Sequence, residues 1–331
     1  KGLADPRPVD ADLTAAQIDG MVRKAIELGD TRTGGLDKII GPEEWVVVKL
    51  NLSAYDGQEG YVTGSATDPR VVESLLAWLA EHHCGQRITL AEGSALWQTV
   101  ERSHAKADGW TTDWGGKFGG FSYRQMIDRI SKRYPQTRFE IVDLNFDDPL
   151  EMPVPGKSIA KNNPDGMYLI PKTIQQCDRL ISVGPLQTRP GVGVSLALDN
   201  YLGIAPGSKY GFPKDGLSKL GSREEVMIDL FNFRPADYAL LGGSYGVEGE
   251  GPAGPNAASV HHNLVLAGTN AMATDAVAAA IMGFRPAELP YLQLAWKNGL
   301  GIYDTDSIWM RGNEIEQAAR PFRKPGNWKK A

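Results

Sequence analysis

Apolar residues in the first third of the chain alternate between helical and strand spacing. Residues 15–28 place apolar side chains on one face, which predicts an amphipathic helix packed on a sheet. Residues 45–50 form a short, almost wholly apolar run rich in valine, which predicts a strand buried on both faces and favours parallel pairing. Residues 69–83 return to helical spacing, and residues 87–91 have strand character again. Strand, crossover helix and strand are the unit of a doubly wound sheet.

The alternation continues through the rest of the chain. Further strands are predicted over residues 138–144, 179–183, 238–241 and 263–266, and further helices over residues 123–134, 192–202, 223–231, 271–282 and 288–298. Residues 149–164 contain four prolines and little periodicity, so we expect an excursion from the sheet that pairs with residues 167–170 as a hairpin. The fold class is therefore α/β, with a mostly parallel sheet flanked by helices on both faces.

The pattern also suggests how the chain is divided. We expect a single α/β domain over residues 45–301, an N-terminal helical segment over residues 1–44 and a C-terminal extension over residues 302–331. A segment rich in tryptophan and glycine, residues 96–121, interrupts the periodicity and predicts an inserted loop. Its aromatic side chains either contact a partner or pack over the sheet.

Composition and charge exclude several classes of protein. In 331 residues, 42% are hydrophobic and 23% charged, and no apolar run reaches the about 18 residues that span a bilayer, so we expect a soluble protein. The net charge is −5 and no basic block is present, which argues against nucleic-acid binding. Two cysteines cannot hold a four-cysteine cluster, so no intrinsic iron–sulfur cluster is expected. Export after removal of a signal and a cytoplasmic location both stay open.

Three polar residues stand where predicted strands end. Lys49 and Asn51 lie at the carboxyl end of the strand over residues 45–50, and Glu92 follows the next strand. Open α/β sheets bind ligands beyond these ends, which makes Lys49 and Asn51 candidate substrate-binding residues and Glu92 a candidate acid. Simpler roles stay open, because a lysine also snorkels to water, an asparagine caps turns and a glutamate fits a solvated turn.

An oxygen-rich cluster follows the third predicted strand and comprises Asp143, Asn145, Asp147 and Asp148. Magnesium and calcium bind such oxygens, so a divalent metal is one expectation. The spacing lacks the glycine and distal glutamate of an EF-hand loop, and a solvated turn is the favoured interpretation. The metal ligands therefore stay unassigned.

Residues 184–193 join the strand over residues 179–183 to a predicted helix, and they combine glycines with Thr188 and Arg189. Glycines let backbone N–H groups approach an anion, a helix N-terminus adds partial positive charge, and Arg189 supplies a planar donor. Thr188, Arg189 and the later Asn200 are therefore candidate substrate-binding residues. A dinucleotide site is rejected because the third glycine of the fingerprint is missing.

The densest glycine segment is residues 242–255, a predicted loop after a strand. Ordering such a segment costs conformational entropy, which is understandable if it holds a ligand or passes close to another backbone, and a plain surface loop stays open. Glu248 is the chosen catalytic acid, and Gly249 and Gly251 are candidate substrate-binding residues.

Other ionisable residues give weaker signals. Asp275 lies among alanines in the helix over residues 271–282, where it is either water-facing or buried with a partner; a buried position would imply a function. Adjacent histidines point in opposite directions, which makes a zinc site improbable. Neither a G-x-S-x-G motif nor a Walker A motif is present, which argues against those hydrolase classes.

Taken together, these segments resemble the family of the domain of unknown function 362 (DUF362). The resemblance covers about residues 45–301 and rests on six pieces: VVVKLNL, Thr67-Asp68-Pro69, Glu92-Gly93, SVGPLQTRPGVGVSLALDNYLG, GVEGEGPAGPN and LAGTNAMATDAVAAAIMGF. It implies an α/β fold, a site built from these loops and a redox-linked context, because relatives are often joined to ferredoxin-like iron–sulfur modules. We expect this chain to be a variant without that module.

The chain departs from the family pattern at two places. The family usually has Lys-Thr-His where this chain has Gln187-Thr188-Arg189, and Lys-Asn where it has Asp199-Asn200. These exchanges are compatible with a swapped charge pair, with altered chemistry or with lost activity.

Two classes of function follow. The first is an enzyme that binds a small anionic substrate, with or without a divalent metal; Lys49 and Arg189 would hold the anion, and Glu92 or Glu248 would transfer protons. The alternative is a non-catalytic binding or accessory subunit of a larger complex, including a redox complex, in which residues 96–121 contact a protein partner.

Overall fold

The computed structural model describes residues 10–29, 35–52, 61–94, 111–112 and 121–328. These residues form one mixed sheet of eight strands in the order β10-β9-β11-β8-β1-β2-β5, with β12 paired to β11. The strands are β1 (Trp45–Lys49), β2 (Arg87–Glu92), β5 (Arg138–Asp143), β8 (Arg179–Gly184), β9 (Gln187–Arg189), β10 (Gly193–Ser195), β11 (Tyr238–Glu248) and β12 (Ala258–Gly268). Strands β11, β8, β1, β2 and β5 are parallel, whereas β12 and β10 run antiparallel to their neighbours. The expected α/β class with a mostly parallel sheet is confirmed.

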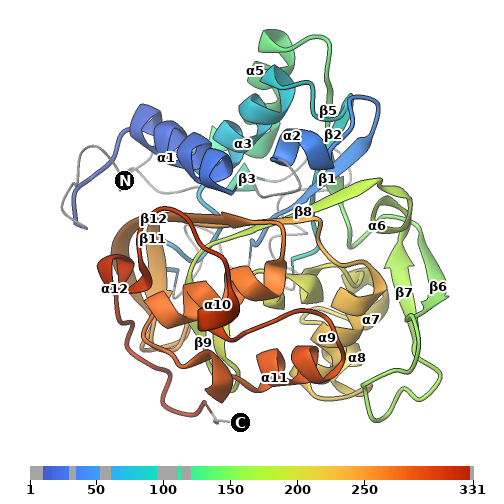
Figure 1. Ribbon diagram of the computed structural model, residues 1–331. Helices are drawn as coiled ribbons and strands as arrows, with labels where there is room; N and C mark the ends of the chain where they lie inside the picture. Colours follow the sequence, from blue (N-terminus) through green and yellow to red (C-terminus); the bar gives the residue numbers. More distant parts are fainter. Residues whose placement is uncertain (1–9, 30–34, 53–60, 95–110, 113–120, 329–331) are drawn as a thin grey trace.

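Helices cover both faces of this sheet (Figure 1). One face carries α1 (Ala15–Leu28), α3 (Pro69–Glu81) and α5 (Tyr123–Arg133), and the other carries α9 (Arg223–Phe233), α10 (Ala271–Ile281) and α11 (Pro290–Lys297). Because side chains alternate along a strand, Val46 and Val48 enter the first core while Val47 enters the second. The buried valines of β1 thus contribute side chains to the hydrophobic cores on both faces of the sheet.

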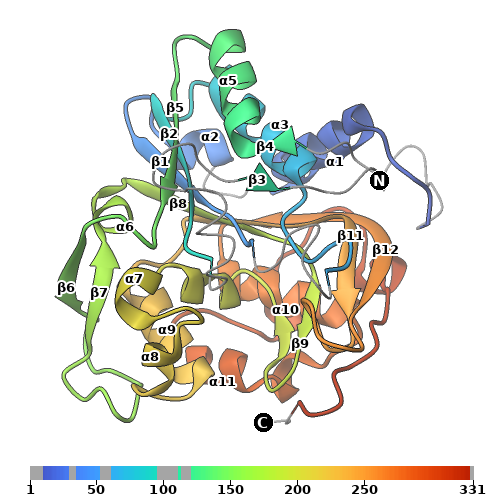
Figure 2. The same ribbon diagram turned by 180° about the vertical axis from the view of Figure 1, so that it is seen from behind.

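Shorter elements complete the described chain. They are α2 (Leu36–Ile39), β3 (Thr111–Thr112), β4 (Phe121–Ser122), β6 (Pro149–Pro153), β7 (Met167–Pro171), α6 (Lys172–Gln176), η2 (Asp199–Gly203), α7 (Gly207–Tyr210), α8 (Asp215–Ser218), η3 (Pro286–Glu288), η4 (Thr305–Ser307) and α12 (Ile315–Ala318). Strands β6 and β7 form the expected hairpin, which stands at one edge of the molecule (Figure 2). Most of the insertion expected over residues 96–121 lies outside the described residues, so its role stays a prediction.

The local sequence accounts for where several helices begin. Thr14 and Gln17 form a capping box at the start of α1, and Ser222 and Glu225 form one at the start of α9. Asp68 caps α3 by accepting a hydrogen bond from the backbone N–H of Arg70.

The prediction of a helix over residues 192–202 is wrong. The structure has the short strand β10 there, followed by the 3₁₀ helix η2. Gly191 and Gly193 adopt positive φ angles of 85° and 91°, which turn the chain back so that β10 pairs antiparallel with β9. No α-helix N-terminus therefore follows residues 184–193, and an anion there cannot be held by such a terminus.

The glycine-rich residues 242–255 also differ from the loop that was predicted for them. Its first part, through Glu248, is not a loop but the continuation of β11, paired with β12. A Cβ atom on Gly246 would stand 2.3 Å from the carbonyl oxygen of Leu186, just before β9, and a Cβ atom on Gly251 would stand 2.6 Å from that of Thr188, in β9. Close passage to another backbone therefore explains these two glycines.

Both segments that flank the expected domain pack against it. Helix α1 buries Ile18, Val22 and Ile26 in the core beneath α3. In the C-terminal extension Phe322 is buried, and its N–H donates to the carbonyl oxygen of Met282 at 2.9 Å. The division into residues 1–44, 45–301 and 302–331 stays a prediction. Among the described helices none combines the length and apolarity needed to cross a membrane.

Candidate functional site

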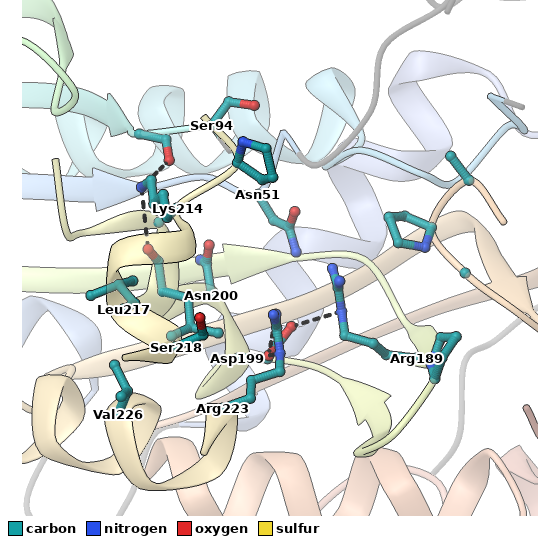
Figure 3. A pocket seen from close by; sticks show the side chains of 18 of the residues that line it. Asn51, Ser94, Arg189, Asp199, Asn200, Lys214, Leu217, Ser218, Arg223 and Val226 are labelled. Atoms are coloured by element: carbon teal, nitrogen blue, oxygen red, sulfur yellow. Dashed lines mark hydrogen bonds and ion pairs between the residues drawn. The ribbon is translucent and has the colours of Figure 1, made fainter. Parts of the chain in front are cut away.

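A cavity of about 660 Å³ opens beyond the carboxyl ends of β1 and β2. Its wall contains Asn51 and Glu92 from these strand ends, η2, the segment 213–223 that leads into α9, and the glycine-rich residues 250–255 (Figure 3). Parallel strands leave their C-terminal ends open to ligands, because the chain turns there into loops that shape a crevice. The cavity is therefore the candidate functional site.

Lys49 lies just behind this wall and is 1% exposed. Its Nζ donates to the carbonyl oxygen of Leu50 at 2.6 Å, to Glu92 Oε2 at 2.9 Å and to Asn200 Oδ1 at 2.7 Å. Burial lowers the pKa of Lys49, and the negative charges of Glu92 and Asp199 oppose that shift. Since all three donors are used inside the protein, Lys49 acts as a fixed internal charge rather than a direct clamp on a ligand.

Glu92 faces the cavity while remaining 3% exposed. Besides Lys49, its carboxylate accepts hydrogen bonds from the N–H of Leu52 at 3.2 Å and from that of Gly93 at 2.8 Å. These donors fix both carboxylate oxygens at the end of β2.

Asn200 connects the ends of two neighbouring strands. Its Nδ2 donates to the carbonyl oxygen of Lys49 and to Ser182 Oγ, each at 3.1 Å, while its Oδ1 accepts from Lys49 Nζ. An amide can do this because it has both donors and acceptors. The cavity floor is therefore rigid where β1 and β8 end.

Two guanidinium groups share one carboxylate on the opposite side of the cavity. Arg223 Nη2 lies 2.7 Å from Asp199 Oδ1, and Arg189 Nε lies 3.2 Å from Asp199 Oδ2. Burial would raise the pKa of Asp199, but Arg223 and Arg189 outweigh it and hold that pKa below its usual value. Burial and the charge of Arg223 lower the pKa of Arg189 to about 10. The two arginines carry two positive charges and Asp199 carries one negative charge, so the group has a net charge of one positive unit.

Lys214 also lines the cavity, on the segment before α8. Its Nζ donates to the carbonyl oxygen of Gly93 at 2.5 Å and to that of Leu202 at 3.2 Å, as Figure 3 shows. Burial and the charge of Lys49 together lower the pKa of Lys214 to about 7, although the negative charges of Glu92 and Asp143 oppose the shift. A lysine with this pKa holds both protonation states near neutral pH.

Asp275, on α10, is fully buried and contacts the backbone segment that precedes η2. It accepts hydrogen bonds from the N–H groups of Ala197 and Leu198, at 2.8 and 3.1 Å, and from the Tyr291 hydroxyl at 3.2 Å. Burial raises its pKa to about 7 against these donors. Of the two alternatives that the sequence left open, water-facing or buried with a partner, the structure shows the second. Asp275 thus holds the segment that carries Asp199 and Asn200, which is a structural role.

Two glycines permit the strand ends and η2 to approach one another. A Cβ atom on Gly203 would lie 2.5 Å from Lys49 Nζ and 2.6 Å from Glu92 Oε1. A Cβ atom on Gly93 would lie 2.4 Å from the carbonyl oxygen of Gly203. The close packing around the buried charges therefore depends on the absence of these side chains.

The structure brings together only part of the predicted site. The predicted residues that line the cavity are Asn51, Glu92, Arg189, Asn200 and Gly251, with Lys49 directly behind them. The others lie outside the lining. Thr188 Oγ1 is buried and donates to the carbonyl oxygen of Gly249 at 2.7 Å, and Glu248 accepts from the N–H of Arg323 at 2.9 Å. Glu248 is not among the residues that line this cavity, and its catalytic role stays a prediction.

The residues of the oxygen-rich cluster make different contacts in the structure. Asn145 is buried and accepts from the N–H of Gly207 at 2.7 Å, and Asp147 accepts from that of Thr173 at 2.8 Å. Asp143 is the register partner of Glu92 on β5, and burial raises its pKa to about 6. Within the described part of the chain, no three His, Cys, Asp or Glu side chains are grouped to hold a metal ion. A divalent metal stays an expectation.

Sequence reasoning missed Lys214 and Arg223. Lys214 lies in a stretch of glycines and prolines without periodicity, and its acceptors are backbone carbonyls, which leave no pattern in a sequence. Arg223 offered one signal, since it opens α9, where the helix dipole disfavours a cation unless an acid such as Asp199 compensates it.

The structure is that of an α/β protein with a cavity at the carboxyl edge of its parallel strands. The chain belongs to the family described as Domain of unknown function (DUF362), whose model matches residues 46–280. No curated protein matches the chain. One similar solved structure is the lactate racemase apoprotein from Thermoanaerobacterium thermosaccharolyticum, with 14% sequence identity and a TM-score of 0.37. The match covers 74% of this chain and 52% of that protein, so the chain spans about half of its length.

Proposed function

We propose that this protein is an enzyme that binds a small organic anion in the cavity at the carboxyl ends of β1 and β2. The observation that carries the proposal is the pair of guanidinium groups, Arg189 and Arg223, joined by the single carboxylate of Asp199 in the cavity wall. Guanidinium groups recognise carboxylates and phosphates through planar, two-pronged hydrogen bonds. The excess positive charge of the trio supports an anion as its ligand.

The rest of the wall supports an organic rather than an inorganic anion. Apolar side chains of Leu202, Leu217 and Val226 line the cavity together with the polar groups. A volume of about 660 Å³ is within the range of pockets for small organic ligands. An anionic head at the arginines with a short carbon body against these residues is the arrangement that we infer.

Acid–base groups in the wall of this cavity support an enzyme rather than a non-catalytic binding protein. Glu92 and Lys214 both line the cavity, and one is a fixed carboxylate while the other has a pKa of about 7. Proton transfer is most efficient when the pKa of the group lies near the working pH. Lys214 therefore replaces Glu248 as the second proton-transfer group in our proposal.

Calorimetric titration of the whole chain with phosphate, succinate and citrate tests the binding step. We expect at least one organic anion to bind, and Arg223→Gln to weaken it at least about tenfold, because a charge-assisted hydrogen bond is lost. Arg129→Gln is the matched control, since Arg129 pairs with Glu73 on the far helices. Equal affinities of the wild type and Arg223→Gln would contradict the proposal.

Nuclear magnetic resonance spectra of each bound anion, recorded with a small amount of protein, test turnover. We expect new signals with the wild type and none with Arg223→Gln. An anion that binds with the expected dependence on Arg223 but stays chemically unchanged would favour the alternative of a non-catalytic binding protein.

A further inference from the structure

Lys214 differs from the other cations of the site because backbone carbonyls, not carboxylates, hold it. Its Nζ donates to the carbonyl oxygens of Gly93 and Leu202, at 2.5 and 3.2 Å. Arg189 and Arg223, in contrast, both pair with Asp199. A nitrogen held by neutral acceptors does not need its positive charge to remain in place.

The number of acceptors matches the neutral amine. A neutral lysine amine has two N–H donors and one lone pair, whereas the ammonium form has three donors. The two carbonyl oxygens take both donors of the neutral form and leave its lone pair unused. Since Lys214 lines the cavity, this arrangement turns the wall into a position for a nucleophile.

Charged groups on three strands surround this nitrogen. Lys49 from β1 disfavours the ammonium form, while Glu92 from β2 and Asp143 from β5 favour it. Burial adds to the effect of Lys49, and the pKa falls to about 7. Enzymes activate amine nucleophiles in this way, by removing the lysine from water and placing a second cation beside it.

We propose that Lys214 forms an imine with a carbonyl-bearing organic acid, such as a 2-oxo acid, whose carboxylate is held by Arg189 and Arg223. This inference rests on the proposed function and names the substrate class of the same cavity. In Figure 3, Lys214 lies on one side of the pocket and the two arginines lie on the other, so that a carboxylate and a carbonyl of one ligand can face different groups.

The chemistry of the step is balanced without a further reactant. The lone pair of Lys214 Nζ attacks the carbonyl carbon, a carbon–nitrogen bond forms, and the carbonyl oxygen becomes a hydroxyl group with one amine proton. That hydroxyl then leaves as water with the second amine proton, and a carbon–nitrogen double bond remains. Each imine formed therefore releases one water molecule and involves no oxidation or reduction.

Reductive trapping tests this inference on the whole chain. The protein is incubated with glyoxylate or pyruvate and sodium cyanoborohydride, and the modified lysine is located by peptide mass spectrometry. We expect one equivalent at Lys214, formed at least about tenfold faster than at exposed lysines near pH 7, because those are almost fully protonated there. The rate at Lys214 should rise through about pH 7.

Two variants make the result specific. Lys214→Arg keeps a cation in the wall and should abolish the single rapid modification, whereas Lys219→Arg, at an exposed neighbour, should leave it unchanged. Modification spread over exposed lysines, or an unmodified Lys214 with glyoxylate, the smallest of these acids, would overturn the inference. If succinate still binds in an Arg223-dependent manner in that case, the proposed function stands and only the imine fails. If no organic anion binds, both fail.

Discussion

At the scale of single residues, the site depends on charges that are removed from water and then fully partnered. An isolated buried ion is strongly disfavoured, and a buried pair is tolerated only when further hydrogen bonds satisfy it. Lys49 and Glu92 meet this condition, since three acceptors surround the ammonium and backbone N–H groups complete the carboxylate. The pair is a rigid foundation for the cavity rather than a large source of stability.

Lys49→Met should therefore destabilise the protein by about 3 to 5 kcal/mol, because it leaves the Glu92 carboxylate buried without its cation. The double variant Lys49→Met with Glu92→Gln should recover part of this loss, since no unpaired charge remains. Urea denaturation of the wild type, both single variants and the double variant measures the coupling. Strictly additive losses would mean that the two side chains do not depend on each other.

Asp275 should make stability depend on pH. Its pKa of about 7 lies above the ordinary value of 3.8, so between these pH values the folded protein keeps a proton that the unfolded chain releases. Stability from this group is therefore lost as pH rises from about 4 to about 7, and Asp275→Asn removes the dependence.

Denaturation at several pH values measures this effect. The wild type should lose on the order of a few kcal/mol relative to Asp275→Asn across that window. Asp165→Asn, at an exposed position, should follow the wild type throughout. A difference between the wild type and Asp275→Asn that does not change with pH would refute the assignment.

The sequence predicted those site residues that follow the topology of strands. Asn51 and Glu92 were expected at strand ends, and the wall of the cavity contains both. Lys214 could not be found in this way, because its partners are the backbone carbonyls of Gly93, after β2, and of Leu202, in η2, and because burial lowers its pKa. A sequence shows which residues carry charge, but it does not show which of them lose their contact with water.

At the scale of elements, the spacing of apolar residues predicted most helices and strands. Helix α1 is recognisable by its single buried face, and β1 by an apolar run that is buried on both faces. The failure over residues 192–202 has a physical cause, since Val192, Val194, Leu196 and Leu198 are all buried at strand spacing between glycines. Periodicity did not predict the extension of β11 either, because its glycines serve close backbone approach and bury no side chain.

Gly203→Ala should show how tightly η2 is fitted against the strand ends. The new methyl group would meet Lys49 Nζ and Glu92 Oε1, and overpacking of this kind costs about 1 to 3 kcal/mol. Anion binding should weaken in the same variant because the charged groups must shift.

Gly20→Ala is the control for that substitution. Gly20 lies inside α1 with open space around its Cβ position, so alanine should stabilise the protein by about 0.5 to 1 kcal/mol. Thermal denaturation of both variants checks the contrast. A Gly203→Ala protein as stable as the wild type would show that η2 can move away from the buried pair.

At the scale of the whole molecule, the segments at both ends of the described chain are built into the cores. Helix α1 buries three aliphatic side chains against one face, and Phe322 joins the core on the other face. Arg323 also donates its backbone N–H to Glu248, which connects the C-terminal extension to the end of β11. The chain should therefore lose its structure as a unit rather than shed its ends first.

Phe322→Ala tests this expectation. Removing a buried phenylalanine costs about 3 to 5 kcal/mol, and the loss should appear in one cooperative transition by both circular dichroism and tryptophan fluorescence. Leu150→Ala, on an exposed position of β6, should change stability by less than about 0.5 kcal/mol. Separate transitions for the two probes would indicate that the C-terminal extension unfolds on its own.

The cavity has two walls of different construction. Hydrogen bonds among Lys49, Glu92 and Asn200 fix one wall to the sheet, whereas Leu217 and Val226 contribute only apolar surface to the other. Substitutions at Leu217 or Val226 change the space offered to a ligand without removing a hydrogen bond from the sheet side. Small evolutionary steps at these two positions can therefore reshape the cavity while the hydrogen-bonded groups at the strand ends stay in the same framework.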